Sequence, residues 1–280
     1  MTQRFNSFDD TAIAYTEAGA GLPLLCLSGL TRNASDFDYV APHLRDVRMI
    51  RMDYRGRGAS DWADPATYTI AVEARDTLAL MDHLGLERAA ILGTSRGGLI
   101  AMVLAATAKD RLIGICLNDI GPVVAPEGIE VIRGYLGKNP NARTLEEAAE
   151  ARAHVMQAQF PDVPMSRWRE EVAKFFIETP DGLRINYDPD LARIFDAPDP
   201  GADPAPPDFW PFYDAMAGLP LAALRGENSE LLSAETWAEM QRRRPDMIAA
   251  SVANRGHVPF LDEPEAVATI TAWIARCISA

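Results

Sequence analysis

Short runs of apolar residues alternate along the first part of the chain with segments whose apolar residues recur at helical spacing. The strand-length runs are PLLCLSG (23–29), VRMIRMDY (47–54), RAAILGTS (88–95) and RLIGICLNDIG (111–121), and the helical segments between them are 34–46, 69–85 and 97–110. Strands that are apolar throughout are typical of a parallel sheet with helices on both faces. A hairpin, RFNSF (4–8) and AIAYTEAG (12–19), is expected to precede them, with its turn at Asp9 and Asp10.

The alternation breaks at Pro122. Residues 126–178 hold helical patterns with no intervening strand, and six prolines then follow between Pro198 and Pro211, a composition that predicts an extended surface connection. Afterwards the alternation resumes, with strand patterns at 221–227 and 246–254 and helical patterns at 234–243 and 264–278. We therefore predict an α/β core, 1–121 and 209–280, with a mostly parallel eight-stranded sheet, and a helical cap, 122–208, inserted after the sixth strand.

Right-handed crossovers align the carboxyl ends of parallel strands along one edge of the sheet, so we expect the chemistry and the cap at that edge. The formal charge of −13 and the pI near 4.8 argue against nucleic acid or an anionic membrane as partner. We expect a small-molecule substrate and a monomer or homodimer.

The amino-terminal residues resemble a strand rather than a signal peptide, and apolar stretches such as LIAMVLAATA are about half the roughly 20 residues that a membrane span needs. Cys26, Cys116 and Cys277 are odd in number and far apart, which favours buried free thiols in a reducing compartment. These patterns predict a cytoplasmic protein.

The stretch AILGTSRGGLIA (90–101) places a serine between glycines where a strand passes into a helix, and it contains the pattern G-x-S-x-G around Ser95. A structural turn and a phosphate-binding loop are the alternatives, but the stretch lacks the lysine of a P-loop and the spacing of a dinucleotide fingerprint. Small residues on both sides permit so sharp a turn, and the helix amino terminus favours negative charge. We interpret Ser95 as a nucleophile.

A serine nucleophile needs a base, and the chain contains four histidines. His43 and His83 lie in predicted covering helices, and His154 lies in a predicted cap helix, where a structural role is the ordinary expectation. His257 lies in a Gly-rich turn after the predicted last strand, at the same sheet edge as Ser95. We therefore predict that His257 is the base.

The acid that orients this base is ambiguous in the sequence. Glu230, in LRGENSELLS, follows the strand before the one that leads to His257. Asp119, in CLNDIGP, ends the strand directly after the helix of the nucleophile and could approach the histidine from the other side, although it could equally anchor the start of the cap. Asp53, in MDYRGRGAS, is interpreted as structural.

The oxyanion site should consist of backbone N–H groups. One is that of Arg96, directly after the nucleophile. The second should come from the loop after the third strand, where Gly29 allows close approach and Leu30 can donate. The adjacent residues Thr31, Arg32 and Asn33 are expected to cap a helix near Ala34, with pocket lining as the alternative.

Together, GTSRGG after a strand, DYRGRGAS two elements earlier, a late GHVPF and the order nucleophile, acid, histidine resemble the α/β-hydrolase family over nearly the whole chain. Its capped serine-hydrolase members resemble this chain in the helical insertion. Two departures stand out. Ser28-Gly29 replaces the His-Gly of many relatives, and Ser229 occupies the usual position of the acid in a Gly-x-x-Asp loop, with Glu230 one place later. Some relatives take the acid from the end of the sixth strand, which here is Asp119, so both candidates stay open.

Serine at position 95 argues against the dehalogenases and epoxide hydrolases of the family, which carry Asp there. The resemblance implies an acyl-enzyme mechanism on a small, largely apolar ester, lactone or related carbonyl compound, without cofactor or metal. A C–C bond hydrolase of aromatic degradation and a non-catalytic binding protein on the same scaffold are the alternatives. Aromatic residues in FPDVPMSRW, AKFFI and DFWPFYDAM could line a pocket or pack helices.

Overall fold

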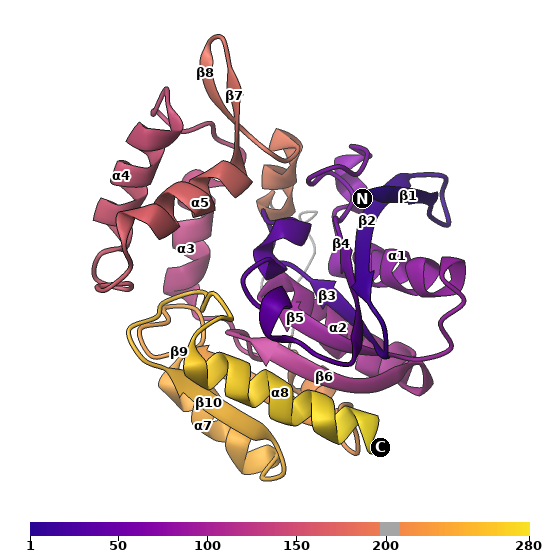
Figure 1. Cartoon of the computed structure of the whole chain (residues 1–280). Coiled ribbons are helices and arrows are strands. Elements are labelled where there is room, and N and C mark those ends of the chain that lie inside the picture. The colour runs from indigo at the N-terminus through magenta and orange to yellow at the C-terminus, as the bar shows by residue number, and fades with distance from the viewer. Residues whose placement is uncertain (197–207) are drawn as a thin grey trace.

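An eight-stranded sheet forms the centre of the computed structural model, which describes residues 1–196 and 208–280 (Figure 1). Its strands are β1 (Gln3–Asn6), β2 (Ala12–Gly19), β3 (Leu22–Leu27), β4 (Val47–Met52), β5 (Ala89–Thr94), β6 (Leu112–Asn118), β9 (Leu221–Gly226) and β10 (Ile248–Val252). Their spatial order is β1-β2-β4-β3-β5-β6-β9-β10. The first hairpin pairs antiparallel, β2 pairs antiparallel with β4, and the other neighbours are parallel. The predicted α/β fold with a mostly parallel sheet is confirmed.

Helices cover both faces of the sheet, which explains why its central strands β3, β5 and β6 are almost entirely apolar. One face packs against α1 (Ile70–His83), α2 (Arg96–Thr107), α6 (Trp210–Asp214) and α7 (Ala234–Arg243), and the other against α8 (Pro264–Ile278) and a short 3₁₀ segment. Side chains along β3 alternate accordingly: Leu25 and Leu27 belong to the first core cluster, whereas Leu24 and Cys26 belong to the second.

The predicted helix over 34–46 is wrong as a single element. The chain forms two 3₁₀ turns instead, η1 (Ala34–Phe37) and η2 (Ala41–His43). Pro42 explains the interruption, because it has no N–H to pair with the carbonyl of Asp38 and its ring would collide with that carbonyl in a continuous α-helix.

Between β6 and β9 the chain forms a group of elements that lies together at one side of the sheet (Figure 1). They are α3 (Pro126–Tyr135), α4 (Leu145–Met156), α5 (Met165–Phe175), the hairpin β7 (Phe176–Thr179) and β8 (Gly182–Ile185), and η5 (Pro189–Phe195). Trp168 and Val172 of α5 are buried against Phe160, and this cluster continues onto Phe260, which belongs to the loop after β10.

The hairpin β7 and β8 corrects the expectation that residues 126–178 hold no strand. Helix α5 ends at Phe175, and the pair turns at Pro180 and Asp181. The signal was present, since Pro-Asp-Gly between apolar residues favours a tight turn.

The division into a core, 1–121 and 209–280, and a cap, 122–208, stays a prediction. The proline-rich connection predicted for this region falls largely on 197–207, outside the described residues.

Cys26, Cys116 and Cys277 are all buried and free. Burial raises the pKa of each thiol, which disfavours its thiolate form. Among residues 1–196 and 208–280, no helix has both the length and the apolar character that crossing a membrane requires.

A buried ion pair joins the loop after β4 to α1. The side chains of Arg55 and Asp76 are fully buried, and two hydrogen bonds of 2.7 Å run from Arg55 Nε and Nη2 to the two carboxylate oxygens. Ser7 Oγ donates to the same carboxylate at 2.5 Å. Such a two-bond pair fixes the orientation of both side chains, and removal of one partner leaves the charge of the other buried without compensation.

Arg55→Met should therefore lower the free energy of unfolding by about 3–5 kcal/mol, because the charge of Asp76 stays buried without its partner. Arg4→Met is the matched control, since Arg4 pairs with Asp61 at the surface, where both side chains are about half exposed, and should change stability by less than about 1 kcal/mol. Urea denaturation of both variants measures the difference, and equal losses would contradict the assignment.

Candidate active site

Three loops at the carboxyl edge of the sheet bring distant residues together. Ser95 directly follows the last residue of β5, Asp119 directly follows the last residue of β6, and His257 lies in the loop between β10 and α8. Because β5 and β6 are parallel neighbours, their carboxyl ends meet, and the backbone N–H of Ser95 donates to the carbonyl of Asn118 at 3.0 Å.

The three side chains form a continuous series of hydrogen bonds. Ser95 Oγ lies 3.0 Å from His257 Nε2, and His257 Nδ1 lies 2.7 Å from Asp119 Oδ2. An ionised carboxylate can only accept, so the proton of the ring belongs on Nδ1 and Nε2 is left to accept the serine proton.

The carboxylate of Asp119 is fully buried, and every bond it makes orients it. Oδ1 accepts from the backbone N–H of Gly226 at 2.7 Å, and Oδ2 accepts from Ser229 Oγ at 2.6 Å as well as from the histidine. The role of Ser229 was missed in the sequence, where it was noted only as the residue in the usual position of the acid.

Glu230 lies outside this network, and its side chain is exposed. The turn after β9, in which the N–H of Ser229 donates to the carbonyl of Gly226 at 3.0 Å, directs the serine inward and the next residue toward solvent. Of the two acid candidates, the structure brings Asp119 to the histidine and leaves Glu230 apart.

The backbone at Ser95 has φ 50° and ψ −115°, a conformation that requires support from its surroundings. Gly93 and Gly97 provide room for it. A Cβ at Gly93 would lie 2.6 Å from the carbonyl oxygen of Gly97, and a Cβ at Gly97 would lie 2.0 Å from the carbonyl oxygen of Leu27. Both glycines are therefore explained by close approach of backbone to backbone.

The two predicted oxyanion donors flank Ser95. A Cβ at Gly29 would lie 3.7 Å from Ser95 Cβ, so the loop after β3 adjoins the serine. Within the described residues, neither the N–H of Leu30 nor that of Arg96 donates a hydrogen bond. Arg96 also begins α2, where the positive end of the helix dipole favours an anion.

Buried charges hold Leu30 and Arg96 in place. Glu73, fully buried on α1, accepts from Arg96 Nε at 2.5 Å and pairs with Arg57 Nη1 at 2.9 Å. Arg57 Nε in turn donates to the carbonyl of Leu30 at 3.0 Å. One carboxylate thus positions the residues on either side of the serine.

The remaining histidines lie elsewhere. His43, His83 and His154 are exposed, and the ring of His83 stacks on Phe5 with their centroids 5.1 Å apart. Asp53 is structural as predicted, since its carboxylate accepts from the backbone N–H groups of Ala34 and Ala59.

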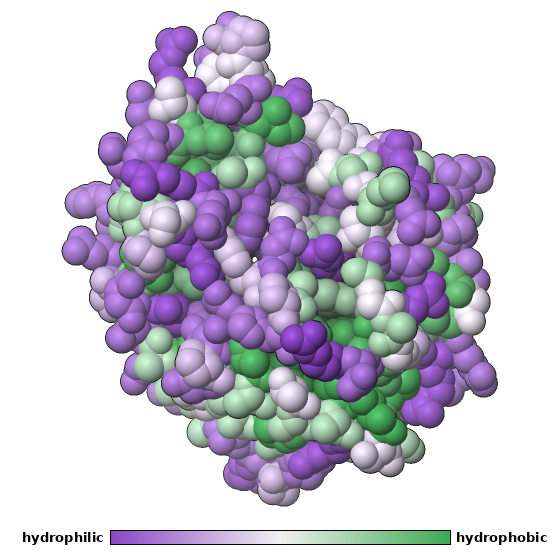
Figure 2. Space-filling view, viewed as in Figure 1, coloured by the Kyte–Doolittle hydropathy of each residue, from purple (hydrophilic) through white to green (hydrophobic). Residues whose placement is uncertain are grey.

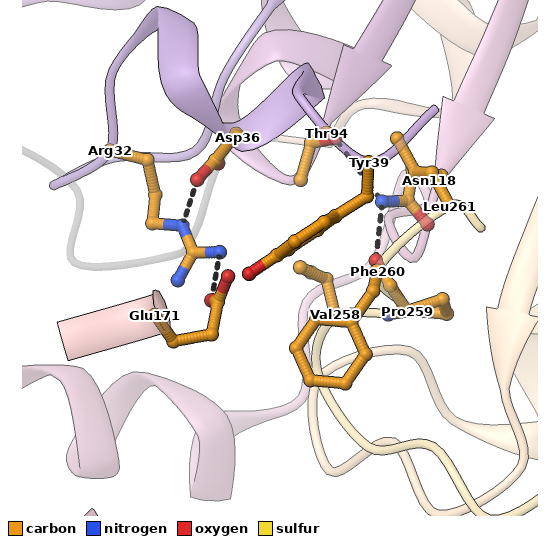
Figure 3. A pocket seen from close by; sticks show the side chains of 10 residues that line it. All are labelled: Arg32, Asp36, Tyr39, Thr94, Asn118, Glu171, Val258, Pro259, Phe260 and Leu261. Atoms are coloured by element: carbon orange, nitrogen blue, oxygen red, sulfur yellow. Dashed lines mark hydrogen bonds and ion pairs between the residues drawn. The ribbon is translucent and has the colours of Figure 1, made fainter. Parts of the chain in front are cut away.

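A charged cluster occupies the space between the loop after β3 and α5 (Figure 3). Arg32 bonds to Asp36 through Nε at 2.6 Å and to Glu171 through Nη2 at 3.1 Å, and Lys174 Nζ pairs with Glu171 at 3.0 Å. Burial disfavours the charge of Glu171, but Arg32 and Lys174 outweigh it and lower its pKa to about 2. Burial dominates at Asp36 and raises its pKa.

The capping role expected of Thr31, Arg32 and Asn33 belongs to Asn33, whose side chain accepts from the N–H of Ser35 at 3.0 Å. Arg32 instead lines a small pocket beside the site. The other lining residues are Asp36, Tyr39, Thr94, Asn118, Glu171, Val258, Pro259, Phe260 and Leu261. Nothing in the sequence pattern linked Arg32 to Glu171, which lies far along the chain.

The aromatic residues offered as pocket lining mostly pack helices and loops together. Phe160 and Trp168 pack edge-on at 5.7 Å between ring centroids, and Trp210 packs on Tyr213 at 5.6 Å. The surroundings of Ser95 on the side of α5 are therefore more charged than the sequence suggested.

Comparison with known proteins agrees with this architecture. The family model described as "Alpha/beta hydrolase family" matches residues 24–270. A crystal structure of an alpha/beta hydrolase from Novosphingobium aromaticivorans superimposes with a TM-score of 0.89 at 38% sequence identity, covering 100% of this chain and 98% of that one.

Two curated relatives are also similar over most of their length. The 3-hydroxybutyrate-oligomer hydrolase of Cupriavidus necator is 37% identical over 252 residues, which are 88% of this chain and 85% of the relative. The 2-(acetamidomethylene)succinate hydrolase of Mesorhizobium japonicum is 25% identical over 251 residues, 89% and 86% of the respective chains.

The close approach at Gly97 predicts that Gly97→Ala lowers the free energy of unfolding by about 1–3 kcal/mol, because the added methyl group must displace the backbone of Leu27. Gly134→Ala in the exposed part of α3 is the control, since nothing lies within 4 Å of its Cβ position. That change should stabilise the protein by about 0.5–1 kcal/mol. Urea denaturation distinguishes the two variants. A Gly97→Ala protein as stable as the control would show that the backbone of Leu27 can move to accommodate the methyl group.

Proposed function

Since the chain belongs to the alpha/beta hydrolase family, we propose that it is a serine hydrolase that cleaves a carboxylic ester through an acyl-enzyme. In this proposal Ser95 is the nucleophile, His257 is the general base and acid, and Asp119 is the carboxylate that orients the histidine. The N–H groups of Leu30 and Arg96 bind the oxyanion.

One observation carries the proposal: the unbroken series of hydrogen bonds from Ser95 Oγ through His257 to Asp119. The serine hydroxyl is a weak nucleophile until its proton is removed, and Nε2 is within reach to remove it. The buried carboxylate keeps the ring in the required tautomer and stabilises the imidazolium that forms.

Acylation follows from this arrangement. As Ser95 Oγ bonds to the ester carbonyl carbon, its proton passes to His257 Nε2 and the carbonyl oxygen becomes an oxyanion. Backbone donors aimed at that oxygen lower the barrier, because they are held rigidly before the reaction begins. Collapse breaks the bond to the alcohol oxygen, which takes the proton from Nε2.

Deacylation repeats these steps with water. His257 Nε2 accepts a proton as the water oxygen bonds to the acyl carbon, and the proton returns to Ser95 Oγ as the acid leaves. The products are one carboxylic acid and one alcohol.

The similarity to the 3-hydroxybutyrate-oligomer hydrolase of Cupriavidus necator supports the choice of a substrate class to assay. We take short oligoesters of hydroxy acids as the first class to assay, alongside p-nitrophenyl esters of short acids, which report the chemical step on a neutral substrate.

Ser95→Ala should abolish covalent labelling by a fluorophosphonate probe and lower the kcat/KM for p-nitrophenyl butyrate by about 10⁴-fold or more, because the atom that forms the acyl-enzyme is gone. Labelling is read by intact-protein mass spectrometry. An unlabelled wild-type protein, or equal labelling of the variant, would contradict the role of Ser95 as nucleophile and would favour a non-catalytic binding protein.

Asp119→Asn should lower kcat by about 10⁴-fold, because the amide can donate to Nδ1 and favour the wrong tautomer. Glu230→Gln is the matched control: an equally conservative change at an exposed position one residue after Ser229, expected to keep kcat within about twofold. Steady-state kinetics on p-nitrophenyl butyrate measures both. If the glutamine variant fails and the asparagine variant turns over normally, the acid is Glu230.

A further inference from the structure

The charged cluster beside Ser95 contains one arginine with no acidic partner. Its ion-paired members are Arg32, Asp36, Glu171 and Lys174, two cations and two anions. Arg152 of α4 joins them as a third cation: it is partly buried, and among the described residues it forms no ion pair. The cluster therefore carries one more positive charge than negative.

The position of Arg152 is defined by an aromatic ring. Its guanidinium carbon lies 4.9 Å from the ring centroid of Phe175, and that of Arg32 lies 4.2 Å from the same centroid. Two like charges thus share one ring, and burial together with the charge of Arg32 lowers the pKa of Arg152. Nε of Arg152 is buried, with no hydrogen-bond partner among the described residues.

A buried donor without a partner is costly, and a guanidinium offers its donors in a fork that matches a carboxylate. An anion bound here would accept a hydrogen bond from Arg152 Nε and balance the surplus positive charge. It would also reduce the repulsion between Arg32 and Arg152. Hydrophilic side chains are indeed prominent along the junction between the inserted helices and the core, near the centre of the view in Figure 2.

The cluster adjoins the nucleophile through Arg32. A Cβ at Gly29 would lie 3.1 Å from Arg32 Cγ and 3.7 Å from Ser95 Cβ, so the stem of this arginine and the serine contact the same point of the loop. The side chain of Arg32 therefore starts beside the serine and ends at Glu171 and the ring of Phe175, where Arg152 also lies.

We propose that Arg152, assisted by Arg32, binds a free carboxylate of the substrate, so that the protein acts on ester acids and cleaves oligoesters next to their carboxylate end. The inference rests on the proposed function. Arg152 is a specificity residue in it, since it binds the substrate away from the reacting carbonyl.

The chemistry is that of terminal ester cleavage. In an oligoester of a hydroxy acid, the free carboxylate belongs to the last unit, whose hydroxyl oxygen forms the last ester bond. Water cleaves that bond: the preceding unit leaves Ser95 as a carboxylic acid, and the last unit leaves as the free hydroxy acid after its oxygen takes a proton from His257. No oxidant, reductant or other reactant is required.

The test compares two substrates that differ at one group: a linear dimer of 3-hydroxybutyrate, and the same dimer with its terminal carboxylate replaced by a carboxamide. For the wild-type protein, kcat/KM for the acid should exceed that for the carboxamide by about 10- to 100-fold. Arg152→Gln should bring this ratio close to one, mainly by raising KM for the acid, and Arg152→Lys should restore at least part of it. Liquid chromatography of the products supplies the rates.

Arg169→Gln is the matched control, because Arg169 lies on the same inserted segment but is about half exposed and pairs with Glu146 at the surface. It should keep the wild-type ratio. A ratio that stays high in Arg152→Gln, or a loss of the same size on both substrates, would assign Arg152 to packing on Phe175 and overturn the proposal.

Hydrolysis of p-nitrophenyl butyrate tests the proposed serine-hydrolase function independently of the carboxylate site, because this ester has no free carboxylate. A wild-type protein that cleaves this neutral ester but does not distinguish the two dimers is a serine hydrolase without the carboxylate site. A protein that cleaves none of the three esters contradicts the proposed function itself.

Discussion

The carboxylate of Asp119 is withdrawn from water, and a buried negative charge is tolerable only where hydrogen-bond donors replace its hydration. Those donors are Gly226, the last residue of β9, Ser229 in the loop that follows it, and His257 in the loop after β10. The same bonds that satisfy the charge therefore hold the last two parallel strands in place against β6. One buried charge thus links the three loops that carry the site.

A second buried carboxylate performs the corresponding task on the other side of the serine. Glu73 joins Arg57 and Arg96, and through them it fixes the loop after β3 and the start of α2. The strained backbone of Ser95 thus lies between two buried acidic groups, Asp119 held by hydrogen bonds and Glu73 held by ion pairs to Arg57 and Arg96. In the proposed mechanism, rigid donors and a rigid nucleophile are what electrostatic stabilisation of the transition state demands.

Much of the fold could be predicted because a sheet covered on both faces favours apolar residues along its central strands, and the candidate nucleophile and the late histidine follow from the edge at which such strands end. The acid could not be chosen, since the choice depends on whether the turn after β9 directs Ser229 or Glu230 inward. Pro42 and the Pro180-Asp181 turn are local signals in the sequence for the interrupted helix and for the hairpin. The ion pair between Arg32 and Glu171 has no signature in the local sequence, because it arises from packing between segments far apart along the chain.

The hydrogen-bonded pairing of β6 with β9 joins Ile115 to Leu221 across the whole inserted segment. The entropy lost in closing such a loop grows only with the logarithm of its length, about 0.6 kcal/mol for each doubling. Extra helices can therefore enter at this point while the parallel sheet keeps its stability. The elements from α3 to η5 belong to a part of the chain whose length has little effect on the stability of the sheet, so natural variation or protein engineering can exchange them as a unit.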